Sequence, residues 1–460
     1  MAYTRRKSHE ITVGNIRLGG SNPIRVQSMT NTSTMDTEAS VAQILRIAEA
    51  GGELVRLTTQ GTREAENMEL ISKAVRQAGS SVPLVADVHF NPNVADVAAC
   101  YCEKVRINPG NYVDAARQFK QLEYTDEQYA QELQKIEARL LPFLAICREH
   151  GTAMRIGVNH GSLSDRIMSR YGDTPEGIVE SCMEFLRICV RHDFMNVVIS
   201  IKASNTVVMV QSMRLLVQEM EKEGMTFPLH LGVTEAGEGE DGRIKSAVGI
   251  GALLTEGIGD TIRVSLSEAP EKEIPVARQL VDMISECTRL RQEAEAGIKD
   301  DTVVLRLQAS SLEELQLKAA MAVGAIFIDK KAHLLNIEAE GFAEDTLRDL
   351  SDSILQAARI KFVKTEYISC PGCGRTLYDL EGTIHKIKAA TAHLKGLKIA
   401  IMGCIVNGPG EMADADYGYV GAARGKVSLY KAKECIEKNI PEEEAVERLL
   451  KFIEEDLREG

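Results

Sequence analysis

Short β-branched runs recur along residues 24–266, and each is followed by a polar loop and an amphipathic helical stretch. Strands that alternate with helices in this way form parallel βαβ units. The predicted strands are IRVQS at 24–28, LVRL at 54–57, LVAD at 84–87, KVRI at 104–107, MRIGV at 154–158, VVISIK at 197–202, LHLGV at 229–233 and TIRVSL at 261–266. Eight such units predict an α/β fold with a closed (β/α)8 barrel of the TIM type, in a domain at 1–290.

The rest of the chain has a different pattern. Residues 300–329, DDTVVLRLQASSLEELQLKAAMAVGAIFID, predict strand–helix–strand, and EDTLRDLSDSILQAAR predicts a helix, so 291–362 is expected to be a small α/β insert or spacer. Residues 363–460 are expected to form a C-terminal α+β domain, with the helix GTIHKIKAATAHL, the strand LKIAIMG and a charged amphipathic helix at the end.

Composition narrows the functional classes. The formal net charge is −13, which argues against a nucleic-acid partner. No apolar run approaches the roughly 20 residues of a membrane span, and MAYTRRKSHE has no apolar signal region. The ten cysteines lie mostly in helix-like apolar contexts. We therefore expect a cytoplasmic protein with mostly free, buried thiols.

Basic residues mark the carboxyl ends of five predicted strands, where a barrel carries its chemistry. They are Arg56, Arg106, Arg155, Lys202 and Arg263, and beside them stand Asp87, His89, Asn108, Asn159, Glu235 and Ser265. One or two of the arginines could leave the barrel and pair with helix carboxylates. Five buried cations without an anion would be costly, so the pattern favours a phosphate or diphosphate ligand.

GEGEDG at 237–242 fits the dinucleotide-binding pattern G-x-G-x-x-G between a strand and a helix. Glu238, Glu240 and Asp241 would place negative charge against a pyrophosphate, and no ribose-binding acid follows the next strand. We expect these glycines to shape a flexible loop over the barrel mouth.

Cys370 and Cys373 lie in the turn SCPGCGRT, which is typical of a metal site with about four ligands. A zinc ribbon would need a second C-x-x-C, which the chain lacks. Cys404, in a Gly/Pro-rich loop after a predicted strand, is the best third ligand, and three thiolates fit a [4Fe–4S] cluster with one open iron. Glu411, Asp414, Asp416 or water could complete it. Cys435, in the helix-like run LYKAKECIEK, is expected to be structural, and packing is favoured for Cys100 and Cys102.

Several motifs together resemble the 4-hydroxy-3-methylbut-2-enyl diphosphate synthase (GcpE) family. They are VQSMTNTST, ADVHFNP, KVRINPGN, RIGVNHGSLS, SIKAS, LHLGVTEAGEGEDGRIKSAVGIG, EGIGDTIRVSL, SCPGCGRT and MGCIVNGPGE. The match covers about 1–290 and 363–430. The resemblance implies a reductase-like C-terminal domain with a cluster held by Cys370, Cys373, Cys404 and Glu411, the last on the open iron.

The resemblance also implies a substrate and roles for the strand-end residues. The substrate would be 2-C-methyl-D-erythritol 2,4-cyclodiphosphate of the non-mevalonate isoprenoid pathway, reduced with electrons from ferredoxin or flavodoxin. The five cations would hold the diphosphate with help from Asn108, Asn159 and Ser265. Glu235 would be the acid/base and Glu411 the displaceable ligand, while Asp87 and His89 match a barrel-mouth motif of less certain role.

One departure concerns the segment 291–362. The motifs resemble the long, plant and chlamydial branch, in which an insert of roughly a second barrel separates the halves, but here only about 70 residues occupy that place. Short forms close as a homodimer and long forms within one chain, so the sequence leaves the mode of closure open.

Three other functions are compatible with parts of the sequence. A cluster-bearing dehydratase would turn over without an electron donor. A redox sensor or iron–sulfur carrier would not need the ring of cations, and a zinc-binding interaction module would contain no iron.

Overall fold

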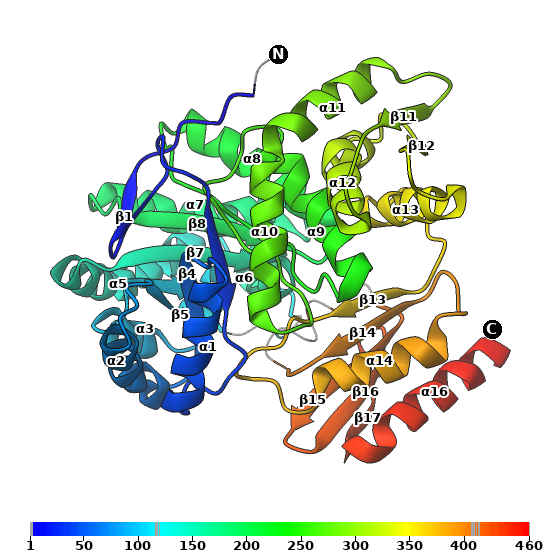
Figure 1. Cartoon of the computed structure of the whole chain (residues 1–460). Helices are drawn as coiled ribbons and strands as arrows, with labels where there is room; N and C mark the ends of the chain where they lie inside the picture. Colours follow the sequence, from blue (N-terminus) through cyan, green and yellow to red (C-terminus); the bar gives the residue numbers. More distant parts are fainter. Residues whose placement is uncertain are drawn as a thin grey trace.

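The computed structural model describes residues 3–115, 118, 120–405, 410, 412 and 415–459. Its centre is a parallel sheet with the strand order β8-β7-β6-β5-β4-β3-β10-β9. Figure 1 shows helices around this sheet and the C-terminal sheet beside it. These strands are β3 (Arg25–Met29), β4 (Leu54–Thr59), β5 (Leu84–Val88), β6 (Lys104–Ile107), β7 (Ala153–Asn159), β8 (Val197–Lys202), β9 (His230–Leu231) and β10 (Thr261–Ile262). A parallel bridge between Ile199 and Leu229 joins β8 to β9 and closes the barrel. The predicted α/β barrel is confirmed.

Helices surround the barrel and connect its strands. They are α1 (Thr37–Glu49), α2 (Thr62–Gln77), α3 (Pro92–Ala99), α4 (Pro109–Tyr112), α5 (Asp126–His150), α6 (Asp165–Tyr171), α7 (Pro175–Arg191), α8 (Thr206–Lys222), α9 (Gly239–Leu254), α10 (Glu273–Asp282) and α11 (Ile284–Ala296). Two short 3-10 helices lie at His160–Ser162 and Pro270–Lys272. Local capping starts many of these helices: Asp36, for example, accepts a hydrogen bond from the Ala39 amide at the start of α1.

An antiparallel hairpin of β1 (Ile11–Val13) and β2 (Ile16–Leu18) covers the amino-terminal end of the barrel. Its Ile11, Val13 and Leu18 form one buried cluster with Leu54 and Val85, which begin or nearly begin their strands. Because this end is sealed by apolar side chains, the opposite end, where the strands finish, is the one open to chemistry.

The segment after α11 forms a two-stranded parallel sheet of β11 (Thr302–Arg306) and β12 (Leu334–Glu338), with α12 (Leu312–Ile328) between them and α13 (Glu344–Ala357) after them. Helix α12 packs against α9 of the barrel. Glycines let the two helices approach, since a Cβ on Gly324 would lie 2.8 Å from the Val248 carbonyl oxygen. The insert therefore shares the barrel's hydrophobic core. The domain limits 291 and 362 stay a prediction.

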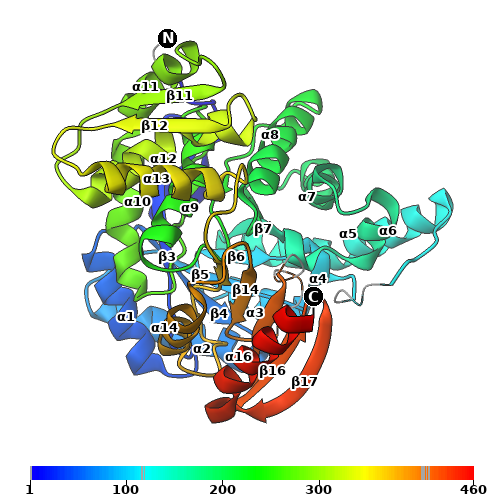
Figure 2. The same cartoon turned by 90° about the vertical axis from the view of Figure 1, so that its right-hand side faces the viewer.

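The C-terminal part is a five-stranded sheet in the order β13-β14-β15-β16-β17. Its elements are β13 (Glu366–Ser369), α14 (Leu380–Thr391), β14 (Lys398–Met402), β15 (Tyr417–Ala423), β16 (Lys426–Lys431), β17 (Glu434–Pro441) and α16 (Glu442–Glu459). Helices α14 and α16 cover one face of the sheet, on the outside of the molecule (Figure 2). Cys370 and Cys373, which follow β13, and Cys404, which follows β14, lie at the barrel mouth.

Three local expectations are wrong. Cys435 lies in strand β17, because β16 and β17 pair as an antiparallel hairpin at the sheet edge. The second strand of the insert was expected before residue 329. Residues 325–328 instead end helix α12, and the strand comes later, at Leu334–Glu338. The glycines of 237–242 were expected to shape a flexible loop. Residues 239–242 are instead the first turn of α9, where the Gly239 amide donates a hydrogen bond of 2.9 Å to the Glu268 carboxylate.

Candidate active site

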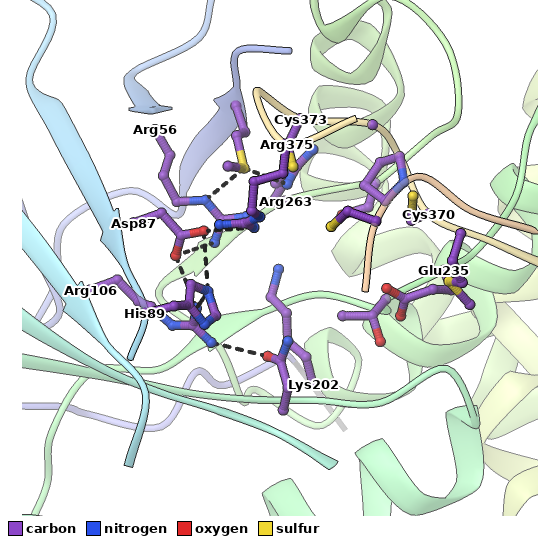
Figure 3. A pocket seen from close by; sticks show the side chains of 18 residues that line it. Arg56, Asp87, His89, Arg106, Lys202, Glu235, Arg263, Cys370, Cys373 and Arg375 are labelled. Carbon is purple, nitrogen blue, oxygen red and sulfur yellow. Dashed lines mark hydrogen bonds and ion pairs between the residues drawn. The ribbon is translucent and has the colours of Figure 1, made fainter. Parts of the chain in front are cut away.

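A cavity lies where the barrel mouth meets the C-terminal sheet (Figure 3). It is lined by Met29, Arg56, Asp87, His89, Arg106, Asn159, Lys202, Thr234, Glu235, Arg263, Ser265, Cys370, Pro371, Gly372, Cys373, Arg375, Met402 and Cys404. Arg56, Asp87, Arg106 and His89 group on one side in Figure 3, and Cys370 and Glu235 lie on the other. Residues from two distant parts of the chain therefore share one cavity.

Contacts between the two parts hold the C-terminal loops over the barrel. Ala236, just past β9, forms a parallel bridge with Ser369 at the end of β13. The hydroxyl of Ser267 donates a hydrogen bond of 2.8 Å to the carbonyl oxygen of Cys370. The C-terminal domain thus closes over the barrel of its own chain.

The cations of the cavity have weak or shared partners. Arg56 donates its Nε–H to the sulfur of Met29 at 3.1 Å, and sulfur is a weak acceptor. The Lys202 side chain is 4% exposed and makes no hydrogen bond or ion pair with another residue that the structure describes. Arg263 is the exception, because its Nε and Nη2 bind both oxygens of Glu273 at 3.0 and 2.9 Å. One of the five arginine and lysine side chains thus pairs with a helix carboxylate.

Asp87 is the shared carboxylate of this cluster. It accepts a hydrogen bond from Nη1 of Arg106 at 3.0 Å, and Nη1 of Arg56 lies 3.9 Å away. Burial opposes ionisation of Asp87, but Arg56 and Arg106 outweigh it and hold its pKa well below the usual range. Among the described residues that line the cavity, two carboxylates, Asp87 and Glu235, face five arginine and lysine side chains, and Glu273 outside the cavity pairs with one of these. The cavity therefore keeps a positive excess.

His89 is neutral in this environment. Burial, followed by the charge of Arg106, lowers the pKa of His89 to about 3. Arg106 also points Nη1 at the Nε2 atom of His89, which requires Nε2 to be the acceptor and Nδ1 to carry the proton. His89 therefore adds a polar but uncharged wall to the cavity.

Mutual repulsion between the buried cations favours an anionic ligand. Burial and then the charges of Arg56, Arg155 and Arg263 lower the pKa of Lys202 well below its usual range. Burial also lowers the pKa of Arg56, to about 10. A bound anion would reverse these shifts, because it would offset the buried positive charge.

Two glycines, one in β7 and one directly after β9, leave room for the cations. A Cβ on Gly157 of β7 would lie 2.4 Å from Nε of Arg106, and one on Gly232 would lie 2.6 Å from Nζ of Lys202. No substituted residue fits at either position without moving the cation. The cations therefore explain why glycine occupies these positions in MRIGV and LHLGV.

Glu235 faces the same cavity and is 4% exposed. Its backbone has φ 49°, in the left-handed region that a residue other than glycine rarely adopts. Such strain costs on the order of 1–3 kcal/mol and persists where the surrounding structure holds it. The backbone is therefore arranged to present this carboxylate.

Three cysteines reach the cavity from the C-terminal domain. Cys370 directly follows β13, Cys373 lies in the same loop, and Cys404 follows β14. The Gly403 amide donates a hydrogen bond of 3.2 Å to the sulfur of Cys370. Burial raises the pKa of the Cys370 thiol to about 12, so a metal centre would be needed to keep this sulfur ionised.

The donor set fits a cluster better than a single ion. Among the residues described, no three His, Cys, Asp or Glu side chains are arranged to hold one metal ion. In an iron–sulfur cluster each thiolate binds a different iron, so three sulfurs around one cavity suit that group. Asp416 is used elsewhere, because its carboxylate accepts a hydrogen bond from the Lys398 amide at 2.7 Å. Glu411 and Asp414 lie outside the described residues.

Two predicted substrate residues do not line the cavity. Asn108 caps α4 through the Gly110 amide and donates to the hydroxyl of Ser162 at 2.8 Å, which uses both ends of its side chain. Arg155 is buried inside the barrel, and its Nε and Nη1 have no hydrogen-bond partner among the described residues.

Arg375, Thr234 and Met29 also line the cavity, and none of them was expected from the sequence. Arg375 stands two positions after Cys373, an expected cluster ligand. This closeness in the sequence could have indicated that Arg375 lines the cavity. The side chain reaches back into the barrel, which the turn motif alone does not indicate.

The fold and the cavity together define a (β/α)8-barrel protein whose C-terminal sheet domain caps a cation-lined mouth with three cysteines. Family models agree with both parts: the GcpE TIM-barrel domain matches residues 8–278 and the GcpE protein C-terminal domain matches 366–455. The chain belongs to the GcpE family.

Curated relatives match along the whole chain and bear the name 4-hydroxy-3-methylbut-2-en-1-yl diphosphate synthase (flavodoxin). The protein of Bacteroides thetaiotaomicron is 52% identical over 605 aligned positions, covering 99% of this chain and 99% of that protein. That of Phocaeicola vulgatus is 52% identical over 600 positions, covering 98% of each chain. Since this chain has 460 residues, these relatives carry internal residues that have no counterpart here.

Proposed function

We propose that this chain is a reductive enzyme of isoprenoid biosynthesis that converts 2-C-methyl-D-erythritol 2,4-cyclodiphosphate into 4-hydroxy-3-methylbut-2-enyl diphosphate. The product is the one in the names of its full-length relatives. The observation that carries the proposal is the shared cavity, in which cations from the barrel face three cysteines from the C-terminal domain. An anionic substrate and a redox centre can meet there.

The cofactor would be a [4Fe–4S] cluster held by Cys370, Cys373 and Cys404, with Glu411 as the fourth ligand. When bound, this cluster supplies electrons one at a time and a Lewis-acidic iron. The loops after β13 and β14 hold the three cysteines at the mouth of the barrel. Their position over the substrate cavity is the main support for this assignment.

The chain's own residues would bind and orient the substrate. Arg56, Arg106, Lys202 and Arg263 would hold the diphosphate and stabilise the negative charge that it gains as its bond to carbon breaks. Arg155 would add positive charge from inside the barrel. Asn159 and Ser265, on the cavity wall, would position the phosphate oxygens.

Glu235 would act as the acid/base, because it is the cavity carboxylate on the side of the cysteines (Figure 3). It can protonate the hydroxyl that leaves as water. Closure of the C-terminal domain over the mouth would exclude bulk water during this step. Asp87 and His89 would fix the orientation of Arg106.

The electron donor would be flavodoxin, which the relatives' name specifies, or ferredoxin. We expect a cytoplasmic enzyme without a nucleic-acid or membrane partner. None of the described helices is both long and apolar enough to cross a membrane. A homodimer would be compatible with this arrangement, with the cap over each mouth coming from the same chain.

The test uses anaerobically purified protein. It should contain about four irons per chain and should consume the cyclic diphosphate only with a low-potential reductant. Turnover without reductant would instead indicate a dehydratase. A protein that binds zinc and no iron would indicate an interaction module and would contradict the proposal.

A further inference from the structure

Arg375 is a cation that the C-terminal domain inserts into the barrel cavity. It follows Cys373 by two residues, and its side chain is only 9% exposed. Its Nη2 lies 3.6 Å from Oδ2 of Asp87, which belongs to barrel strand β5. Figure 3 shows Arg375 beside Arg263 and Cys373. This ion pair joins the two domains at the centre of the site.

The loop that carries Arg375 can hold this position only when the domains are docked. A Cβ on Gly374 would lie 2.7 Å from the carbonyl oxygen of Thr32, in the loop after β3. The hydroxyl of Ser267 holds the carbonyl of Cys370 at the other end of the loop. Because Thr32 and Ser267 both belong to the barrel, movement of the C-terminal domain away from them would withdraw Arg375 from the cavity.

Arg375 lacks partners for part of its guanidinium group. Its Nε and Nη1 are buried and make no hydrogen bond with any residue that the structure describes. Asp87 and the sulfur of Cys404 both interact with Arg375. Neither satisfies it, since Asp87 also receives Arg106 at 3.0 Å and Arg56 at 3.9 Å, and sulfur is a weak acceptor. Buried donors without acceptors are costly, so this arrangement indicates an anion from outside the chain.

We propose that Arg375 is a positioning residue of the diphosphate site, supplied by the C-terminal domain and held by Asp87. The inference rests on the proposed function, in that the anion is the diphosphate of the substrate. Arg375 completes the site only in the docked state. Diphosphate binding and docking therefore stabilise each other, because a ligand favours the conformation that binds it better.

The test is a calorimetric titration of cluster-loaded protein with inorganic pyrophosphate under anaerobic conditions. Arg375→Gln should weaken pyrophosphate binding about 10- to 100-fold, the loss expected for hydrogen bonds to a charged group. Arg375→Lys, which keeps the charge but not the planar fork, should recover part of the affinity. The matched control Arg424→Gln, at an exposed arginine of the same domain, should bind as the unaltered protein does.

Hydrogen exchange of residues 30–36 reports on docking. Pyrophosphate should slow exchange there in the unaltered protein and in Arg375→Lys, and should have little effect in Arg375→Gln. Equal pyrophosphate affinity in Arg375→Gln and the unaltered protein would overturn the role of Arg375 and leave the proposed function intact. Loss of iron from Arg375→Gln with unchanged affinity would also overturn that role. Failure of the unaltered protein to bind pyrophosphate would count against the diphosphate site itself.

Discussion

Gly157 and Arg106 occupy neighbouring strands, and the absence of a side chain on Gly157 creates the space that the Arg106 guanidinium fills. A Cβ on Gly157 would lie 2.4 Å from Nε of Arg106. The opposite end of Arg106 is anchored, since Nη2 donates to the Gly157 carbonyl at 2.8 Å and Nη1 donates to Asp87 at 3.0 Å. The position of this cation is therefore determined by a glycine and a carboxylate together.

We expect Gly157→Ala to displace Arg106 from the cavity. Loss of its contacts should raise the KM for the cyclic diphosphate about 10- to 100-fold, since a hydrogen bond to a charged group contributes about 1.5–3 kcal/mol. Steady-state kinetics would measure it. Gly297→Ala is the control, because Gly297 follows α11 and does not line the cavity. Its new Cβ would lie 3.3 Å from the Glu293 carbonyl oxygen, against 2.4 Å from Arg106 for Gly157→Ala. An unchanged KM in Gly157→Ala would show that Arg106 does not bind substrate.

The cysteines allow a direct comparison of ligand and non-ligand positions. Cys404→Ser should lower the iron content of anaerobically purified protein, because serine replaces a thiolate that the cluster needs. Cys435→Ser should retain full iron content, since Cys435 lies in β17 and does not line the cavity. Iron and sulfide analysis of both variants measures the difference. Equal iron content in the two would remove Cys404 from the cluster.

His89 predicts a pH dependence of stability. Its pKa falls from 6.5 to about 3 in the folded chain, so between these values the unfolded chain binds a proton that the folded chain does not. The free energy of unfolding should therefore fall as the pH decreases from 6.5 toward 3. Denaturant titrations of His89→Asn should show a shallower decline over this window. The exposed His393→Asn should decline as steeply as the unaltered protein.

Glu366 ties the start of the C-terminal sheet to the barrel. It binds Lys245 of α9 at 3.3 Å and also pairs with Arg359, with side chains 8–13% exposed. Glu366→Gln would leave Lys245 buried without its counter-charge, and breaking a buried pair costs about 3–5 kcal/mol. Chemical denaturation should show a loss of this order.

A surface pair provides the comparison for Glu366. Asp345 and Arg348 form an ion pair 2.7 Å long, with side chains 81% and 69% exposed. Asp345→Asn should cost less than about 1 kcal/mol, because water screens exposed charges. Similar losses in the two variants would mean that Glu366 does not stabilise the docking of the domains.

The sequence predicted secondary structure correctly where interactions between neighbouring residues determine it. The predicted strand KVRI coincides with β6 at Lys104–Ile107, because a β-branched run between polar loops is a local signal. LYKAKECIEK misled for the opposite reason. Its lysines and glutamates favour a helix, but pairing between β16 and β17 overrides that preference.

The sequence by itself determined the barrel, the family and the cations and cysteines, because these depend on periodicity and on motif spacing. Tertiary structure decided which of these side chains share the cavity. It assigned Glu273 to Arg263, used Asn108 to cap a helix, and brought Arg375 to Asp87. It also placed the C-terminal domain over the barrel of the same chain. These outcomes depend on distances between segments far apart in sequence, which only the packed chain defines.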